Sequence, residues 1–270
     1  MNNEARPLAL VTGASSGIGA DLARELARDG HDLVLVARGV EAMETLTREL
    51  ESIGARSVII VADLSVQGSA AKLVQEIDER KLSVDVLINN AGFGDRARFQ
   101  NADADKLSRM LQLNIVSLTE LTRLLVPKMM ERGRGKILLV SSTAAFQPVP
   151  NMAVYAATKA YVLSLGEALA HEFQGTGVTV TTLCPGPTKT RFAAVAHAND
   201  SVAFQRQGGL MESSIVAAQG YRALKRGRRT IVSGLANTIG AIGARIIPRS
   251  IAATIAGSLM AEPTPSSTKS

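Results

Sequence analysis

Short apolar runs alternate with longer amphipathic stretches along the chain, and this alternation constrains the fold more than any other feature. The apolar runs have strand length and are rich in β-branched residues; they cover residues 8–11, 33–36, 57–61, 84–88, 136–140 and 178–183, with a weaker run at 230–232. Helical periodicity marks residues 18–28, 40–53, 67–80, 104–131 and 152–173. The alternation predicts βαβ units, and right-handed crossovers favour a doubly wound α/β fold with a central parallel sheet of about seven strands.

Composition narrows the class of protein further. We interpret residues 1–261 as one domain because no linker interrupts the alternation, and a hydrophobic share of 46% is enough for a large core. The single cysteine, Cys184, excludes an internal disulfide and favours the cytoplasm. The N-terminus does not resemble a signal peptide, and the scattered histidines form no metal-ligand pattern. With 3% aromatic residues and no recognition module, nucleic-acid binding is not expected.

Polar residues and glycines follow the ends of the predicted strands. Gly13 comes after the first strand, Asp63 after the third, Asn89 after the fourth, Ser142 after the fifth and Pro185 after the sixth. The carboxyl ends of parallel strands share one rim of the sheet, where ligands bind in open α/β folds. We therefore expect a ligand site on this rim.

A glycine-rich turn, TGASSGIG at residues 12–19, lies between the first predicted strand and the first predicted helix. Glycines permit a tight turn and let a pyrophosphate approach the backbone at a helix N-terminus, where free N–H groups favour anions. The turn therefore predicts dinucleotide binding of the Rossmann type, although an ordinary turn is the alternative. The expected contacts are Gly13, Ser15, Ser16, Gly17, Ile18 and Gly19.

The end of the second predicted strand distinguishes two cofactors. An NAD site usually has a carboxylate there for the ribose 2′-hydroxyl, whereas an NADP site has a cation for the 2′-phosphate. Here the strand runs into Arg38, and the first carboxylate is Glu41. The planar, permanently charged guanidinium of Arg38 suits a phosphate. NADP(H) is therefore favoured over NAD(H), with an unpaired surface arginine as the alternative.

Tyr155 precedes Lys159 by one helical turn, and Ser142 lies thirteen residues upstream of the tyrosine. The reference pKa of tyrosine is about 10, so the side chain is a poor acid or base at neutral pH. A lysine on the same helix face holds positive charge beside the phenol and is expected to lower its pKa. Ser142 could supply a hydroxyl to the same substrate oxygen. Chance spacing on an amphipathic helix is the alternative for the Tyr–Lys pair taken alone.

Residues 8 to about 192 resemble the short-chain dehydrogenase/reductase superfamily in its single-domain form. The glycine-rich turn is similar to the family's cofactor motif, and NNAG at residues 89–92 resembles the stretch after its fourth strand. Asn114, Ser142, Tyr155 and Lys159 align with its catalytic tetrad, and PGPTKT at residues 185–190 resembles the segment that holds the nicotinamide carboxamide. Within the family, the chain is most similar to NADP-linked bacterial reductases.

The resemblance implies a role for each aligned residue. Tyr155 would protonate a carbonyl oxygen in reduction or act as the base in oxidation, and Ser142 would orient that oxygen. Lys159 would contact the nicotinamide ribose and lower the pKa of the tyrosine, and Asn114 would hold a water that links Lys159 to a proton relay. The implied cofactor contacts also include Asp63, Leu64, Asn90, Ala91, Gly92, Pro185, Gly186, Thr188 and Thr190.

Simpler interpretations of three of these positions stay open. Asn114 could cap or kink its helix, and Asn90 could tie neighbouring strands together. Ser141 is the competitor for Ser142, although the family spacing favours Ser142.

The C-terminal third is less patterned. Residues 187–226 are expected to form a substrate lid, and a basic cluster at 222–229 is typical of a solvated helix end followed by a turn. Residues 227–261 contain two uncharged, glycine-rich stretches, each too short to span a bilayer. We interpret them as a docking segment for a weak membrane-surface contact, together with the basic cluster, or for a subunit interface. Residues 262–270 are expected to be a disordered tail.

These features predict an NADP(H)-dependent oxidoreductase that interconverts a ketone or aldehyde and an alcohol by hydride transfer, with Tyr155 as general acid or base. The expected substrate is a small, apolar molecule. The alternatives are a catalytically silent nucleotide-binding protein or a membrane-peripheral protein on the same fold. The resemblance also implies a homodimer or homotetramer assembled through the long helices at 104–131 and 152–173.

Overall fold

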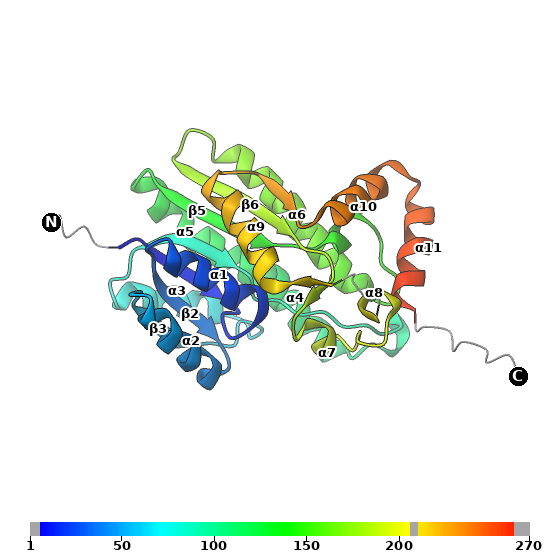
Figure 1. The fold of residues 1–270 in the computed structure, drawn as a ribbon, viewed down its shortest axis with the longest axis horizontal. Helices are drawn as coiled ribbons and strands as arrows, with labels where there is room; N and C mark the ends of the chain where they lie inside the picture. The colour runs from blue at the N-terminus through cyan, green and yellow to red at the C-terminus, as the bar shows by residue number, and fades with distance from the viewer. Residues whose placement is uncertain (1–5, 206–209, 262–270) are drawn as a thin grey trace, which may run out of the picture.

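A seven-stranded parallel sheet forms the centre of the computed structural model, which describes residues 6–205 and 210–261 (Figure 1). The strands are β1 (Leu8–Thr12), β2 (Asp32–Ala37), β3 (Ser57–Val61), β4 (Val84–Asn89), β5 (Gly135–Val140), β6 (Val178–Cys184) and β9 (Thr230–Val232). Their order across the sheet is β3-β2-β1-β4-β5-β6-β9, so the winding direction reverses between β1 and β4. The predicted doubly wound α/β fold is confirmed.

Helices cover both faces of the sheet. On one face lie α1 (Gly17–Arg28), α2 (Val40–Ser52) and α9 (Ser213–Lys225), and on the other lie α3 (Ser69–Glu79), α5 (Leu118–Glu131) and α6 (Ala153–Glu172). Successive residues of β1 point to opposite faces, since Val11 packs with the first group and Leu10 with the second. Burial on both faces explains why the strands are almost continuously apolar in sequence.

The predicted helix at 104–131 is interrupted, which corrects that expectation. The structure has α4 (Ala104–Leu111), a π-helical turn η2 (Gln112–Ser117) and then α5. The buried Asn114 lies in this turn and hydrogen-bonds Phe93 and Thr158, which belong to other segments. These partners explain the local widening, because π turns accommodate an extra residue where a side chain must point to a functional or structural partner.

Short elements follow β6 before the chain returns to the sheet. They are β7 (Thr188–Lys189), α7 (Phe192–Val195), α8 (Val202–Gln205) and β8 (Met211–Glu212), while η1 (Phe99–Asn101) and η3 (Thr143–Phe146) lie earlier in the chain. The expected lid at 187–226 therefore includes α9, whose Val216, Ala217 and Leu224 are buried in the core. A lid is consistent with the fold only before α9.

The chain ends in two further helices, α10 (Leu235–Ile246) and α11 (Arg249–Met260), which lie beyond the carboxyl ends of the strands (Figure 1). The basic cluster spans the last turn of α9 and the turn that precedes β9, so it lies at the opposite, amino end of the sheet. This separates the cluster from the apolar helices with which the sequence interpretation had joined it. None of the helices within 6–205 and 210–261 combines the length and hydropathy of a membrane span. The expected tail lies outside the described residues.

Candidate active site

A cavity of about 1170 Å³ opens at the carboxyl rim of the sheet, as the strand-end residues predicted. Asn89 is the exception among those residues, since its amide points away and donates to Thr122 Oγ1 under α5. Of the predicted site residues, Gly19 and Asn114 do not line the cavity. All the others do: Gly13, Ser15, Ser16, Gly17, Ile18, Arg38, Asp63, Leu64, Asn90, Ala91, Gly92, Ser142, Tyr155, Lys159, Pro185, Gly186, Thr188 and Thr190.

The glycine-rich turn forms a close-packed cradle at the N-terminus of α1. Gly13 and Gly17 have φ of 66° and 57°, a conformation that side chains disfavour. A Cβ on Gly19 would lie 2.4 Å from both the Gly13 carbonyl oxygen and Asn90 Nδ2, so glycine is required there as well. The first turn of α1 carries no acidic side chain, and Ser16 makes no side-chain capping bond within the described residues. Free N–H groups therefore face the cavity and fit a pyrophosphate.

Thr12 was not singled out in the sequence, yet it joins the cradle to β4. Its hydroxyl donates to the Ile88 carbonyl and accepts from the backbone N–H groups of Asn90 and Ala91. The Asn90 amide donates in return to the carbonyl oxygens of Thr12 and Gly13. Asn90 thus ties neighbouring strand ends together, as the simpler interpretation proposed, while its backbone borders the cavity.

Arg38 and Asp63 lie side by side where β2 and β3 end. The Arg38 guanidinium is 71% exposed and 3.9 Å from the Asp63 carboxylate, which accepts a shorter bond of 3.0 Å from Arg109. Burial raises the pKa of Asp63, but hydrogen bonds from Ser65 and the charges of Arg38 and Arg109 outweigh it and leave the pKa below its ordinary value. Arg38 therefore retains donors for an anion. Arg109 on α4 was not predicted as a site residue, because only the fold brings it to Asp63.

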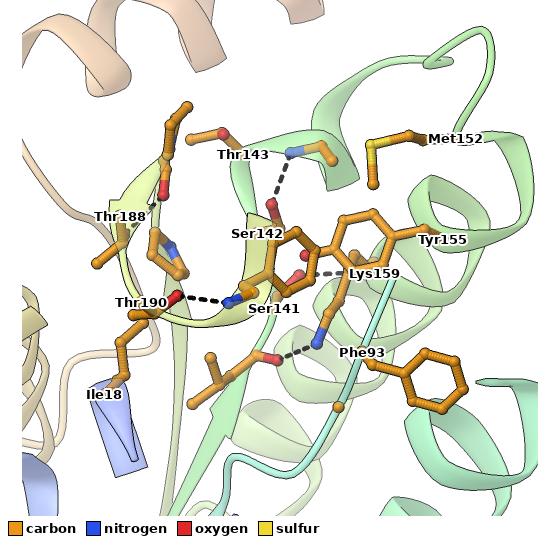
Figure 2. Close-up of a pocket in the computed structure, with 18 of the residues that line it drawn as sticks. Ile18, Phe93, Ser141, Ser142, Thr143, Met152, Tyr155, Lys159, Thr188 and Thr190 are labelled. Carbon is orange, nitrogen blue, oxygen red and sulfur yellow. Dashed lines mark hydrogen bonds between the residues drawn. The ribbon is translucent and has the colours of Figure 1, made fainter. Parts of the chain in front are cut away.

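Tyr155 points toward Ser142 on the floor of the cavity (Figure 2). Burial raises the pKa of Tyr155 to about 12, and the hydrogen bond with the Ser142 side chain opposes this shift. Ser142 Oγ also accepts from the Ala144 backbone N–H at 3.1 Å, which fixes the hydroxyl at the start of η3. Ser141 is different, because its hydroxyl donates to the Lys159 carbonyl and stays buried. The geometry therefore favours Ser142 over Ser141 as the residue that meets a ligand.

Burial raises the pKa of Tyr155, so the lowering expected from Lys159 together with the oxidised nicotinamide ring stays a prediction. Lys159 Nζ donates to the Val140 carbonyl at 2.8 Å and lies 5.8 Å from the centre of the Tyr155 ring. Burial lowers the pKa of Lys159 to about 8, so the side chain loses its proton only above neutral pH. The helical spacing places Tyr155 and Lys159 close together. Burial is nevertheless the main cause of both pKa shifts, raising that of Tyr155 and lowering that of Lys159.

Asn114 connects the loop after β4 to α6. Its Oδ1 accepts from the Phe93 backbone N–H at 3.2 Å, and its Nδ2 donates to the Phe93 carbonyl and to Thr158 Oγ1. A Cβ added at Gly92 would lie 3.0 Å from Asn114 Oδ1 and 3.3 Å from Lys159 Nζ, so both atoms border the same small space. The helix distortion agrees with the simpler interpretation, and the water relay stays a prediction.

The loop after β6 closes over the glycine-rich turn. Thr190 Oγ1 accepts from the Phe192 backbone N–H, and Thr188 Oγ1 donates to the Gly186 carbonyl (Figure 2). A Cβ on Gly17 would lie 2.9 Å from Thr190 Cγ2, which shows how closely the two segments approach. Phe192 then packs on Tyr155, with ring centres 5.2 Å apart, and on Phe204 at 6.3 Å.

The far end of the cavity is apolar, and much of its wall was missed in the sequence. Side chains of large apolar residues surround Tyr155 there: Phe93, Val149, Met152, Phe192, Val195, Phe204, Ile255, Leu259 and Met260. Small residues of α10 and α11 complete the wall: Ala236, Gly240, Ala241, Gly243, Ala244, Ala252 and Ala256. The segment interpreted as a docking segment is therefore also part of the site. Its small residues carry no chemical signal in sequence, and only the fold brings them to the cavity.

Comparison with known families decides what this site belongs to. The family described as short chain dehydrogenase matches residues 7–201, which is well over half of the chain. The chain is a short-chain dehydrogenase. It is therefore an oxidoreductase by family, and the resemblance inferred from its motifs is confirmed.

Three proteins similar to this dehydrogenase illustrate its relatives. The ketoacyl reductase HetN of Nostoc is 35% identical over 66% of this chain and 62% of its own length. The structure of a short-chain dehydrogenase from Sphingobium yanoikuyae in complex with NADPH has a TM-score of 0.78 and 32% identity, and the match covers 88% of this chain and 93% of the other. A bulky-bulky ketone specific alcohol dehydrogenase from Comamonas testosteroni has a TM-score of 0.75 and 31% identity, covering 85% and 86% of the two chains.

The family match ends at residue 201, whereas the cavity of this dehydrogenase continues onto α10 and α11. The cofactor cradle, the tetrad and the start of the lid lie inside the matched region. The C-terminal wall lies outside it.

Proposed function

We propose that this dehydrogenase interconverts a ketone and an alcohol, with Tyr155 as the general acid or base and NADP(H) as the cofactor. The observation that carries the proposal is that Ser142, Tyr155 and Lys159 line one cavity, at the junction of a nucleotide cradle and an apolar chamber. When bound, the nicotinamide supplies or accepts the hydride.

Proton delivery is the task of the chain itself. With a pKa of about 12, Tyr155 holds its proton at neutral pH and can donate it to a substrate oxygen as that oxygen gains electron density. Ser142 is fixed by Ala144 and can hydrogen-bond to the same oxygen, which orients the carbonyl. In reduction the carbonyl carbon gains the hydride and the oxygen gains the tyrosine proton; oxidation reverses both transfers.

Binding of the cofactor rests on the cradle and on Arg38. Gly13, Ser16 and Gly17 would hold the pyrophosphate at the N-terminus of α1, and Asp63 with Leu64 would border the adenine. The exposed guanidinium of Arg38 suits a 2′-phosphate, and the similar Sphingobium protein is described in complex with NADPH. These observations support NADP(H) over NAD(H).

The chamber around Tyr155 supports an apolar substrate of considerable size. Most of its side-chain lining beyond Ser142 is aliphatic or aromatic, with Gln147 and Asn237 as polar members, and the cavity of about 1170 Å³ is larger than most ligand pockets. The names of two similar proteins, a ketoacyl reductase and a bulky-bulky ketone specific alcohol dehydrogenase, agree with this class. Bulky apolar ketones are therefore the first substrates to screen.

Replacement of Arg38 by Asp tests the cofactor. We expect NADPH binding to weaken about a hundredfold, because a charge-assisted contact becomes repulsive, while NADH binding changes much less. Fluorescence titration with both nucleotides measures the two constants. Equal losses for both would remove Arg38 as the phosphate contact.

Replacement of Tyr155 by Phe tests the chemistry. Turnover of a ketone with NADPH should fall about a thousandfold or more, because the proton donor is lost. NADPH affinity should stay within about a factor of three of the wild type. Turnover retained by the variant would refute the mechanism, and wild-type protein that binds NADPH but reduces no ketone would favour the silent nucleotide-binding alternative.

A further inference from the structure

The residues of α10 are distributed in the reverse of the usual pattern for a surface helix. Small residues such as Ala241 and Ala244 face the cavity, while Leu235 and Ile246 are each 78% exposed. Ile239 and Ile242 are also exposed, and the four positions follow i, i+4, i+7 and i+11, which places them on one stripe. Large aliphatic side chains on the outward face indicate that something apolar covers it.

The stripe continues onto α11, and the two helices project from the end of the sheet (Figure 1). Ile251 and Ile255 are each about half exposed on α11. We define the hairpin patch as Leu235, Ile239, Ile242, Ile246, Ile251 and Ile255. These six exposed aliphatic residues lie together on one projecting hairpin. A single exposed aliphatic residue is common on protein surfaces, but a group of this kind indicates a contact surface.

The charged residues on the hairpin itself are both cationic. The sequence has no Asp or Glu between Glu212 and Glu262, and the hairpin carries Arg245 and Arg249. Arg245 lies over the Phe146 ring and 3.5 Å from Glu167, whereas Arg249 is exposed and makes no ion pair within the described residues. The hairpin therefore offers apolar and cationic groups together, which is typical of helices that lie in the headgroup region of anionic membranes.

We propose that the hairpin patch docks on an anionic lipid surface. A projecting hairpin can enter the headgroup region, whereas a pair of such hairpins from two copies would add like charges at one interface. The cavity mouth lies beside the patch, because Ile255 and Val195 both line the cavity and are about half exposed. Docking thus turns the mouth toward the bilayer, from which an apolar ligand can enter. The basic cluster at 222–229 lies at the other end of the sheet and has no part in this contact.

Vesicle flotation of the full-length protein tests the proposal. Wild-type protein should float with vesicles of equal parts phosphatidylcholine and phosphatidylglycerol, and much less with phosphatidylcholine alone. The double variant Ile239→Ser and Ile246→Ser should lower the partition coefficient about tenfold or more, since two apolar side chains no longer enter the interface. Arg249→Gln should lower the preference for anionic vesicles about fivefold.

A matched control comes from the rest of the surface. Ile53 and Ile215 are exposed to 46% and 49%, and their replacement by Ser should leave flotation unchanged. None of these variant positions lines the cavity, so NADPH binding and thermal melting should stay close to wild type and will report folding. Arg249→Gln keeps the test decisive if the double serine variant does not fold.

Two results would overturn the proposal. One is wild-type protein that does not float with anionic vesicles. The other is a hairpin double variant that floats as well as the control but dissociates in light scattering, which would assign the patch to a second copy of the chain.

Discussion

Burial, more than proximity, determines the chemistry of Tyr155 and Lys159 at the scale of single residues. Both side chains are almost completely buried, and burial shifts each pKa toward the neutral form. Tyr155 therefore holds its proton, and Lys159, with a pKa of about 8, is still mostly protonated at neutral pH. A site of this kind starts as a proton donor, which suits the reductive direction.

Replacement of Lys159 by Met gives a stability test of that assignment. The pKa of Lys159 is lowered from 10.5 to about 8, so the folded state binds fewer protons than the unfolded state between those values. Stability of the wild type therefore rises as pH increases through this window, and the burial penalty is fully present below about pH 8. The variant lacks this dependence.

We compare the free energy of unfolding of the wild type with that of the Lys159→Met variant. As pH rises from near 7 to above about 10.5, the wild type should gain about 3 kcal/mol relative to the variant. Urea unfolding of both proteins without cofactor, across this range, measures the shift. A pH-independent difference would mean that Lys159 is fully charged in the folded protein.

Sequence reasoning predicted which residues meet in the cavity but not their protonation. The order and spacing of Ser142, Tyr155 and Lys159 were enough to predict that they share one cavity. The burial that raises the pKa of Tyr155 could not be predicted, because it depends on how many atoms of distant segments surround the phenol. Phe192 and Gly94 illustrate this, since a Cβ on Gly94 would lie within 3.1 Å of both Phe192 and Tyr155.

At the scale of elements, the turn between β1 and α1 leaves no room for side chains. Gly19 lies against the Gly13 carbonyl and the Asn90 amide, and that amide bonds the carbonyl oxygens of Thr12 and Gly13. A methyl group at this point pushes on backbone and on a hydrogen-bonded amide together. The turn and the start of β4 therefore behave as one rigid unit.

Replacement of Gly19 by Ala should destabilise the protein by about 2–3 kcal/mol, because the backbone must shift to relieve the contact. NADPH binding should weaken about tenfold or more as the cradle opens. Gly39→Ala is the matched control, since it lies on the same cavity and a Cβ there meets no atom within 4 Å. Thermal melting and titration of both variants measure the effects, and equal behaviour would mean that the cradle adapts.

Elements with a regular hydrophobic period were predicted well, and elements shaped by distant contacts were not. All seven predicted strands are present within about two residues of their expected ends. A kink at Asn114 was one of the open interpretations, but the π turn itself was not predicted because Asn114 bonds Phe93 and Thr158, which lie far away in the sequence. The helix α10 was not predicted, because its small residues face inward and its large aliphatic residues face outward. A buried helix face is normally recognised by large apolar residues at helical spacing.

At the scale of the whole molecule, an N-terminal nucleotide half and a C-terminal substrate half meet at Tyr155. The first half is the region that the family match covers, and its cradle is built from loops after β1 to β4. The remaining part adds α8, α10 and α11 around the apolar chamber. The family match covers the region that carries the predicted motifs and ends before α10 and α11, which explains why the sequence indicated the family but not the substrate.

Association through the long helices is the remaining expectation at this scale. Val116, Leu124 and Tyr161 are each 38% exposed on η2, α5 and α6, away from the hairpin patch. We expect a dimer or tetramer in light scattering at micromolar concentration. Leu124→Asp should weaken association about a hundredfold, since a two-fold interface loses the leucine twice. A wild-type monomer would contradict the prediction.

The wall of alanine and glycine on α10 and α11 has an evolutionary consequence. Alanine codons become valine codons, and glycine codons become alanine codons, by one nucleotide change. Each such change at Ala241, Ala244 or Gly240 would add one or two methyl groups to the chamber without touching the cofactor cradle or the tetrad. The range of ligands that fit can therefore narrow in small steps while the reaction is retained, so descendants of one ancestral gene can diverge in substrate from this wall alone.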